Sequence, residues 1–307
     1  MNRVNIISNQ DGTLLSIMYF EVTNPKGIVQ IVHGMCEHKE RYKELLHVLG
    51  ENGYIGIIHD HRGHGQSVKK NKDLGYFGEN GARDMVDDVY QVNQWIHQKY
   101  PSLPIYLLGH SMGSLVARVY LQKYERSISG LIVCGSPSYN PLASLGIPLT
   151  TFLERKKGVY YRSPFVHRIA FGLYNRKIKD AKSEHQWICS DDEVVKQYDK
   201  DPLCNFMFTV NGYHALFTLM KWTYSKKYYH PRKPHLPILF ISGKEDPCLV
   251  SEKKFDGAVD FMADQGYDQV ESILYPKMRH EILNETHRQI VYKDLIQFLN
   301  SINQSNY

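Results

Sequence analysis

The chain has 307 residues, of which 42% are hydrophobic and 22% are charged, with a formal net charge of +5. These values lie near those of ordinary globular domains and exclude collagen-like, coiled-coil and intrinsically disordered proteins. The five cysteines are an odd number without a CxxC pair, which argues against a disulfide framework and a four-cysteine zinc site. The first twelve residues lack the apolar stretch of a secretory signal, so we expect a cytoplasmic protein.

Short β-branched runs alternate with amphipathic stretches along most of the chain. The predicted strands, in chain order, are Val4–Ile7, Leu14–Phe20, Ile28–His33, Tyr54–His59, Ile105–Gly109, Gly130–Cys134, Ile238–Ser242 and Val270–Tyr275. The predicted helices are Arg41–Glu51, Ala82–Lys99, Ser111–Tyr124, Ser251–Gln265 and Glu285–Asn300. This alternation predicts an α/β fold with a mostly parallel, eight-stranded sheet flanked by helices.

The alternation stops after the sixth predicted strand and resumes at Pro234. The intervening residues 138–232 hold 17 of the 37 aromatic residues and 15 Lys and Arg against 8 Asp and Glu. Within this region, Leu142 to Leu153 is uncharged, but the glycines and prolines of the wider stretch Ser127–Leu153 exclude a transmembrane helix. We therefore predict three parts: residues 1–137 as the first part of a core domain, residues 138–232 as an inserted helical cap, and residues 233–307 as the second part of the core.

Residues 109–113 read Gly-His-Ser-Met-Gly, and they join a predicted strand to a predicted helix. Such an elbow presents its serine at the edge of the sheet, and the crowded backbone admits only glycine two residues to either side. The N-terminus of the helix contributes a positive dipole, and the Met112 N–H can face a developing oxyanion. We therefore predict that Ser111 is a nucleophile. The alternative is a serine that only caps the helix.

A serine nucleophile needs a base and an acid that orients it, which follow in the chain order serine, acid, histidine. Two loops at the carboxyl ends of later strands supply candidates, Asp246 and His280. Asp246 is preferred to Glu245 because Pro247 follows it and restricts its backbone at a turn. The alternatives are a solvated turn carboxylate and an ordinary loop histidine.

The loop after the third strand reads His33-Gly34-Met35-Cys36. Gly34 permits a tight turn that points the Met35 N–H inward, so Met35 and Met112 are the predicted backbone donors of an oxyanion hole. We interpret His33 as a histidine that stabilises this loop. The alternative is a simple polar turn.

A histidine cluster at residues 59–64 suggests a metal site, because His59, His61 and His64 are spaced somewhat as in the HxHxDH motif of metallo-β-lactamase-like hydrolases. The match is incomplete, since Gly63 stands where an aspartate should precede His64. No later histidine is evidently poised as a further ligand. We therefore expect neither a metal nor a cofactor.

Five motifs occur in one order along the chain: HGMCEHKERY, DHRGHGQS, GHSMGS, SGKEDP and RHEILNE. Together they resemble the monoacylglycerol lipase, lysophospholipase and serine aminopeptidase-like group of α/β-hydrolases, bacterial members especially. The resemblance covers nearly the whole chain and implies the α/β-hydrolase fold. It also implies the site residues already predicted: the triad Ser111, Asp246 and His280, and the N–H groups of Met35 and Met112.

The same resemblance concerns substrate binding. It implies that Glu37 and Arg41 line the polar end of the pocket. Animal monoacylglycerol lipases carry a histidine that contacts glycerol three residues after the catalytic histidine, and this chain has Leu283 there. The sequence thus departs from the animal enzymes at the position that contacts the glycerol group in them.

The predicted cap contains leucines at helical intervals, Leu142, Leu145, Leu149 and Leu153, followed by Arg155, Lys156 and Lys157. An aromatic-rich cap above the nucleophile suits an apolar acyl pocket. In one interpretation the leucines, Leu145 and Leu149 among them, line this pocket, and together with the basic residues they dock on an anionic membrane. In the other, the leucines pack on the core and the basic residues form a solvated face.

The preferred function is therefore a serine hydrolase of single-chain lipid esters that acts through an acyl-enzyme. We expect a small lipid ester as its ligand, with no nucleic acid and no obligate protein partner. One alternative is a peptidase or amidase of the same group. Another is a catalytically silent lipid-binding protein, against which the intact triad argues.

Overall fold

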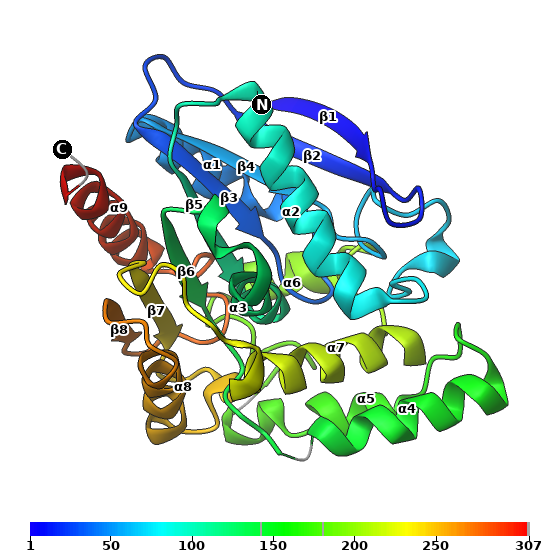
Figure 1. Ribbon diagram of the computed structural model, residues 1–307. Coiled ribbons are helices and arrows are strands. Elements are labelled where there is room, and N and C mark those ends of the chain that lie inside the picture. The colour runs from blue at the N-terminus through cyan, green and yellow to red at the C-terminus, as the bar shows by residue number, and fades with distance from the viewer. Residues whose placement is uncertain (142, 180, 306–307) are drawn as a thin grey trace.

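An eight-stranded sheet runs through the middle of the computed structural model, which describes residues 1–141, 143–179 and 181–305 (Figure 1). Its strands are β1 (Asn2–Ile7), β2 (Leu14–Phe20), β3 (Gly27–Val32), β4 (Tyr54–His59), β5 (Ile105–His110), β6 (Gly130–Cys134), β7 (Ile238–Gly243) and β8 (Val270–Tyr275). Their order is β1-β2-β4-β3-β5-β6-β7-β8. β1 and β2 pair antiparallel, and the sheet is parallel from β4 to β8. The predicted eight-stranded, mostly parallel sheet is confirmed.

The central strands are apolar because helices cover both of their faces. Every residue of β3, β4 and β5 is buried, whereas the edge strand β1 is exposed at alternate positions. This contrast explains why the central strands read as continuous hydrophobic runs.

Two hydrophobic clusters form the core, one on each face of the sheet. The helices α2 (Gly81–Lys99), α3 (Met112–Tyr124) and α8 (Glu252–Asp264) contribute to the first cluster. The helices α1 (Lys43–Glu51) and α9 (Arg288–Ser305) contribute to the second. In α2, Val86, Val89, Val92 and Ile96 are all buried, as a core-facing helix requires. Short 3-10 helices lie at Lys39–Tyr42, Asn71–Asp73, Glu125–Ser127, Tyr174–Lys177, Lys226–Tyr228 and Pro247–Leu249.

The segment between β6 and β7 lies at the carboxyl ends of the central strands (Figure 1). Its described residues include the helices α4 (Ala143–Lys157), α5 (Pro164–Phe171), α6 (Asp192–Lys200) and α7 (Val210–Thr223). α4 packs along α7, which in turn contacts α2 and α3. The limits of a cap at residues 138–232 stay a prediction.

The uncharged stretch that resembled a membrane span is divided among β6, a loop and the first part of α4. Within the described residues, no helix has both the length and the apolar character that a bilayer crossing requires.

The predicted leucine stripe is not uniform. Leu145 is 65% exposed, whereas Leu149 and Leu153 are partly buried and pack against the first core cluster. Leu142 lies outside the described residues. The packing interpretation thus holds for Leu149 and Leu153, whereas contact of the stripe with a substrate or a membrane stays a prediction.

Candidate active site

Ser111 stands at a tight turn between β5 and α3, with φ 53° and ψ −119°. Neighbouring backbone forces glycine at the two flanking positions. A Cβ on Gly113 would lie 2.0 Å from the Val32 carbonyl oxygen, and one on Gly109 would lie 2.4 Å from the Gly113 carbonyl oxygen. The strained backbone of Ser111 is thus held by close packing on both sides, as a strand-to-helix elbow requires.

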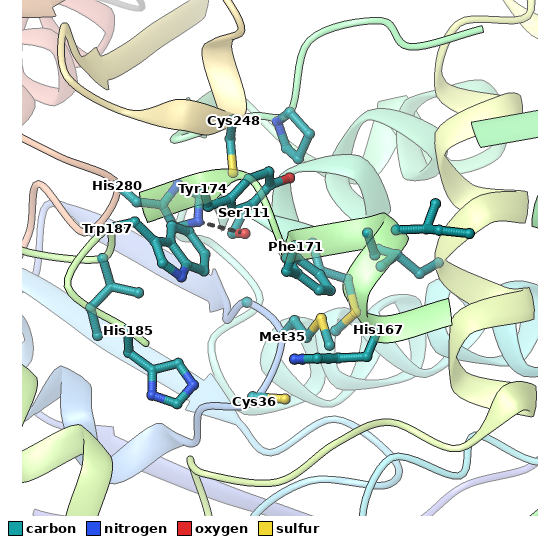
Figure 2. A pocket seen from close by; sticks show the side chains of 18 of the residues that line it. Met35, Cys36, Ser111, His167, Phe171, Tyr174, His185, Trp187, Cys248 and His280 are labelled. Atoms are coloured by element: carbon teal, nitrogen blue, oxygen red, sulfur yellow. Dashed lines mark hydrogen bonds between the residues drawn. The ribbon is translucent and has the colours of Figure 1, made fainter. Parts of the chain in front are cut away.

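The structure brings the three predicted triad residues together. Ser111 Oγ lies 2.8 Å from His280 Nε2, and His280 Nδ1 lies 2.9 Å from Asp246 Oδ2. Figure 2 shows Ser111 and His280 pointing toward one another in the pocket. Asp246 is buried whereas Glu245 is exposed, so the structure favours Asp246 as the partner of the imidazole. This chain of contacts has the geometry of a nucleophile, a base and an orienting carboxylate.

Two further hydrogen bonds fix the Asp246 carboxylate. Ser242 Oγ donates to Oδ2 at 3.1 Å, and the Cys248 N–H donates to Oδ1 at 2.8 Å. The carboxylate therefore cannot rotate freely, and one of its oxygens stays directed at His280.

Met35 and Met112 lie beside Ser111 in the wall of one cavity. Met112 is the first residue of α3, where a backbone N–H has no partner within the helix. In the part of the chain that the structure describes, neither N–H donates a hydrogen bond. Two free N–H groups next to the serine suit an oxyanion hole, which stays a prediction for both residues.

Glu37 and His110 form a buried pair next to the triad. His110 Nδ1 donates to Glu37 Oε1 at 3.0 Å, and His110 Nε2 donates to the His280 carbonyl at 3.3 Å. The Gly34 N–H also donates to Glu37. Burial by itself would raise the pKa of Glu37 and lower that of His110, but their mutual attraction reverses both shifts. Through Glu37, His110 therefore links the Gly34 turn to the loop that carries His280, a function that the motif GxSxG left unassigned.

Arg41 lies elsewhere than the sequence suggested. Its guanidinium pairs with Glu281 at 2.6 and 2.7 Å and with Glu37 at 3.2 Å. Glu37 lines the cavity of Ser111, as predicted, whereas Arg41 lines a second cavity. Arg41 therefore supports the residue next to His280, because its side chain is committed to these two carboxylates.

The loop around His280 is tied to residues 186–190 of the insertion. Arg279 Nη1 donates to two carbonyls of this segment at 2.7 and 2.9 Å. The Glu281 N–H donates to a third carbonyl at 2.7 Å, and Glu285 accepts a backbone N–H from each side at 2.8 and 2.9 Å. The predicted cap and the predicted base are thus mechanically connected, which the motif RHEILNE did not reveal.

The histidine cluster supports the Met35 loop through hydrogen bonds. His33 donates from Nδ1 to the Gly34 carbonyl at 2.8 Å and accepts the His61 N–H at Nε2, at 3.0 Å. His64 Nε2 accepts the Cys36 N–H at 3.3 Å. Burial lowers the pKa of His33 and His61 well below the ordinary value, and that of His64 to about 4. Neutral rings can accept these hydrogen bonds, which supports the loop-stabilising interpretation of His33.

His59 makes stability dependent on pH. Burial first, and then the charge of Lys39, lower its pKa to about 3, against an ordinary value of 6.5. The unfolded chain therefore binds a proton that the folded chain rejects, and stability falls as pH drops below 6.5 toward the folded value. One such histidine contributes at most about 1.4 kcal/mol per pH unit. We expect His59→Leu to flatten the decline of the unfolding free energy between pH 7 and 5, measured by urea denaturation.

The substitution should cost little at pH 7.5. Within the described residues, neither ring nitrogen of His59 has a hydrogen-bond partner, so leucine leaves no donor or acceptor unpaired. Parallel pH profiles for wild type and variant would contradict the assignment of this slope to His59.

A cavity of about 690 Å³ extends from Ser111 into the insertion. Its wall includes both leucines predicted to bind substrate, Leu145 and Leu149. Trp187 packs against His280 with ring centroids 4.9 Å apart, and Figure 2 shows the two side chains next to each other. Leu283, by contrast, is buried in the second core cluster. Its side chain is therefore part of the core packing and not part of this wall.

Two groups of described residues could hold a metal ion. Each brings three ligand atoms within 4.8 Å of one another: His38, Asp201 and Cys204, and Asp246, Cys248 and His280. The second group contains the predicted acid and base. The cluster of His59, His61 and His64 forms no such group in the described part of the chain.

Comparisons with known proteins agree with this fold. A monoglyceride lipase homolog of Monkeypox virus is 28% identical over 283 residues, 92% of each chain. A monoacylglycerol lipase of Mycolicibacterium smegmatis is 25% identical over 278 residues, 90% of this chain and 89% of the relative. A thermostable carboxyl esterase from Bacillus coagulans, solved with glycerol, matches with a TM-score of 0.92 and 27% identity over 98% of each chain.

The resemblance stated from the five motifs is therefore confirmed at the level of the family. The family model described as serine aminopeptidase, S33, matches residues 23–287, which include strands β3 to β8 and the insertion between β6 and β7. Since that match covers most of the chain, and the sheet and its flanking helices have the corresponding architecture, this chain belongs to the serine aminopeptidase S33 family of α/β-hydrolases.

Proposed function

We propose that the protein is a serine hydrolase that cleaves carboxylic esters of single-chain lipids, as a monoacylglycerol lipase or lysophospholipase does. The observation that carries this proposal is the contact of Ser111 with His280, 2.8 Å long, at the wall of a cavity of about 690 Å³. A cavity of this size, lined largely by apolar side chains, has room for an acyl chain. The relatives named as monoglyceride lipases support the same substrate class.

In the first half of the reaction, Ser111 Oγ attacks the ester carbonyl while its proton passes to His280 Nε2. The carbonyl oxygen becomes an oxyanion that faces the N–H groups of Met35 and Met112. Asp246, fixed by its hydrogen bonds, holds the imidazole and stabilises its charged form. The intermediate then expels the alcohol, which takes the proton from His280, and leaves an acyl-enzyme on Ser111.

In the second half, water enters the site of the departed alcohol. His280 takes a proton from this water, whose oxygen attacks the acyl carbon. Breakdown of the second intermediate releases the fatty acid and returns the proton to Ser111. Glu37 and His110 act through position, because His110 donates to the carbonyl of His280 and not to any reacting atom.

A substrate panel tests this proposal against its alternatives. The panel contains monoacylglycerols, lysophospholipids, p-nitrophenyl esters of graded length and aminoacyl anilides, assayed with the full chain. We expect kcat/KM to be highest on single-chain lipid esters. Faster cleavage of the anilides would favour a peptidase. Failure of a fluorophosphonate probe to label Ser111 would favour a silent lipid-binding protein.

Exposed apolar and basic side chains of the insertion also suggest contact with a membrane. Leu145 and Ile169 line the cavity, and their side chains are 65% and 60% exposed. Leu173, two residues after the end of α5, is 70% exposed. The exposed basic residues Arg155, Lys156 and Lys157 end α4. Each basic residue near an anionic surface contributes about 1 kcal/mol. These side chains support a peripheral docking face on α4 and around the end of α5.

We expect replacement of Arg155, Lys156 and Lys157 by Gln to weaken binding to anionic vesicles by up to about 100-fold, and to raise KM on vesicle-borne substrate. Hydrolysis of a soluble short-chain ester should not change. Leu145→Asp should in addition lower turnover of long-chain substrates more than that of short-chain ones. Co-sedimentation with anionic and zwitterionic vesicles checks this prediction, and equal binding of wild type and triple variant to anionic vesicles would refute it.

A further inference from the structure

A second cavity, about 510 Å³ in volume, is bordered by more acidic than basic side chains. Its charged residues are Glu40, Glu44, Asp191, Glu193 and Asp201 on the acidic side, and Arg41 and Arg288 on the basic side. The surplus of negative charge favours entry of cations over anions. His38, Asp201 and Cys204 all lie in the wall of this cavity.

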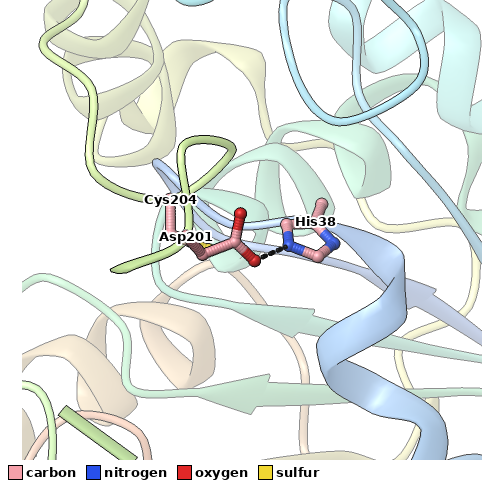
Figure 3. A group of neighbouring side chains, drawn as sticks. All are labelled: His38, Asp201 and Cys204. Atoms are coloured by element: carbon pink, nitrogen blue, oxygen red, sulfur yellow. Dashed lines mark hydrogen bonds and ion pairs between the residues drawn. The ribbon is translucent and has the colours of Figure 1, made fainter. Parts of the chain in front are cut away.

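These three side chains offer one nitrogen, one oxygen and one sulfur ligand (Figure 3). His38 Nε2 lies 2.8 Å from Asp201 Oδ2, and all three ligand atoms lie within 4.8 Å of one another. Cys204 is only 1% exposed, and within the described residues its sulfur makes no hydrogen bond. The buried thiol, which is part of the first core cluster, thus lies within reach of a histidine and a carboxylate.

We propose that His38, Asp201 and Cys204 form a binding site for a divalent transition-metal ion of the zinc type. Zinc binds thiolate at about 2.3 Å and imidazole or carboxylate at about 2.0–2.2 Å, in a tetrahedron whose ligand atoms lie about 3.3–3.7 Å apart. The observed separations, 2.8 Å between His38 Nε2 and Asp201 Oδ2 and at most 4.8 Å for the other pairs, bracket this spacing. With three protein ligands, a water molecule would complete the tetrahedron.

Binding at this site exchanges a metal ion for a proton. A cysteine binds a metal ion as the thiolate, so the Cys204 thiol gives up its proton on binding. When the divalent ion arrives, the S–H bond breaks, a metal–sulfur bond forms, and the proton leaves to water in the cavity. The hydrogen bond between His38 and Asp201 opens at the same time. Metal affinity should therefore fall as pH is lowered.

The site joins two parts of the chain that are distant in sequence. His38 lies three residues after Met35, and Asp201 and Cys204 lie in the insertion just after α6. The two segments already meet where Cys36 Sγ donates to the Phe206 carbonyl at 3.0 Å. A metal ion would replace the hydrogen bond between His38 and Asp201 with coordination bonds to both segments, and would stabilise the folded state by an amount that grows with the logarithm of its affinity.

Cobalt tests the proposal, because a Co²⁺–thiolate bond gives a charge-transfer absorption that oxygen and nitrogen ligands do not. The full chain, freed of metal with a chelator, is titrated with Co²⁺ and the cobalt is then displaced with Zn²⁺. We expect one equivalent of Co²⁺ to produce the thiolate band, one equivalent of Zn²⁺ to abolish it, and Zn²⁺ to raise the thermal midpoint. Absence of a thiolate band would overturn the proposal.

Matched variants locate the ion. Cys204→Ser should abolish the band, and Asp201→Asn should weaken Co²⁺ and Zn²⁺ binding by about 100-fold or more, since even partners outside the ligand sphere are worth 10–100-fold. Cys189→Ser, a buried cysteine of the same insertion, is the control that keeps the band. A band that survives in Cys204→Ser, or that Cys248→Ser removes instead, would place the ion elsewhere and refute the site. These readouts are independent of catalysis and therefore of the proposed function.

Discussion

Ser111→Ala should lower esterase activity by about 10³-fold or more while the protein remains folded. The substitution removes the oxygen that lies 2.8 Å from His280 Nε2, and alanine fits the same elbow because its side chain is smaller. The measurement is kcat/KM on a short-chain p-nitrophenyl ester, together with the thermal midpoint of wild type and variant. We expect the midpoint to change little.

Ser114→Ala is the matched control, one turn further along α3. Its hydroxyl donates to the Ser111 carbonyl at 2.5 Å and does not line the cavity. We expect this variant to keep most of the activity. If Ser111→Ala retained activity within about tenfold of wild type, the assignment of the nucleophile would be wrong.

Asp246→Asn should reduce kcat by about 10³- to 10⁴-fold with little change in KM. The carboxylate accepts from His280 Nδ1 at 2.9 Å, which leaves Nε2 free to take the proton of Ser111. An asparagine amide can donate to Nδ1 instead, which selects the wrong tautomer, and it no longer stabilises the imidazolium. Steady-state kinetics on the same ester checks this expectation.

Glu245→Gln provides the comparison, because Glu245 precedes Asp246 directly and is exposed. We expect its kinetic constants to stay close to those of wild type. A larger loss of kcat in Glu245→Gln than in Asp246→Asn would transfer the orienting function to Glu245.

The sequence by itself determined the layered fold and the members of the predicted triad, because these depend on local patterns. Continuous apolar runs correspond to strands buried on both faces, so β3, β4 and β5 could be located without a structure. The spacing of glycines around Ser111 reflects contacts with backbone atoms of its own elbow and of the adjacent strand. Chain order then narrowed the acid and the base to loops at the ends of two later strands.

Only the tertiary structure decided which polar side chains support the site, because their partners are remote in sequence. His110 meets Glu37 and the His280 carbonyl across 73 and 170 residues. Arg41 lies only six residues after Met35, but its guanidinium pairs with Glu281, 240 residues away. Its side chain therefore lines the second cavity and not the predicted pocket. The exposure of the leucines in α4 was equally undecided by the sequence, because it depends on whether another element covers each turn of the helix. A side chain's partner is set by the packing of whole elements, and no local pattern encodes that packing.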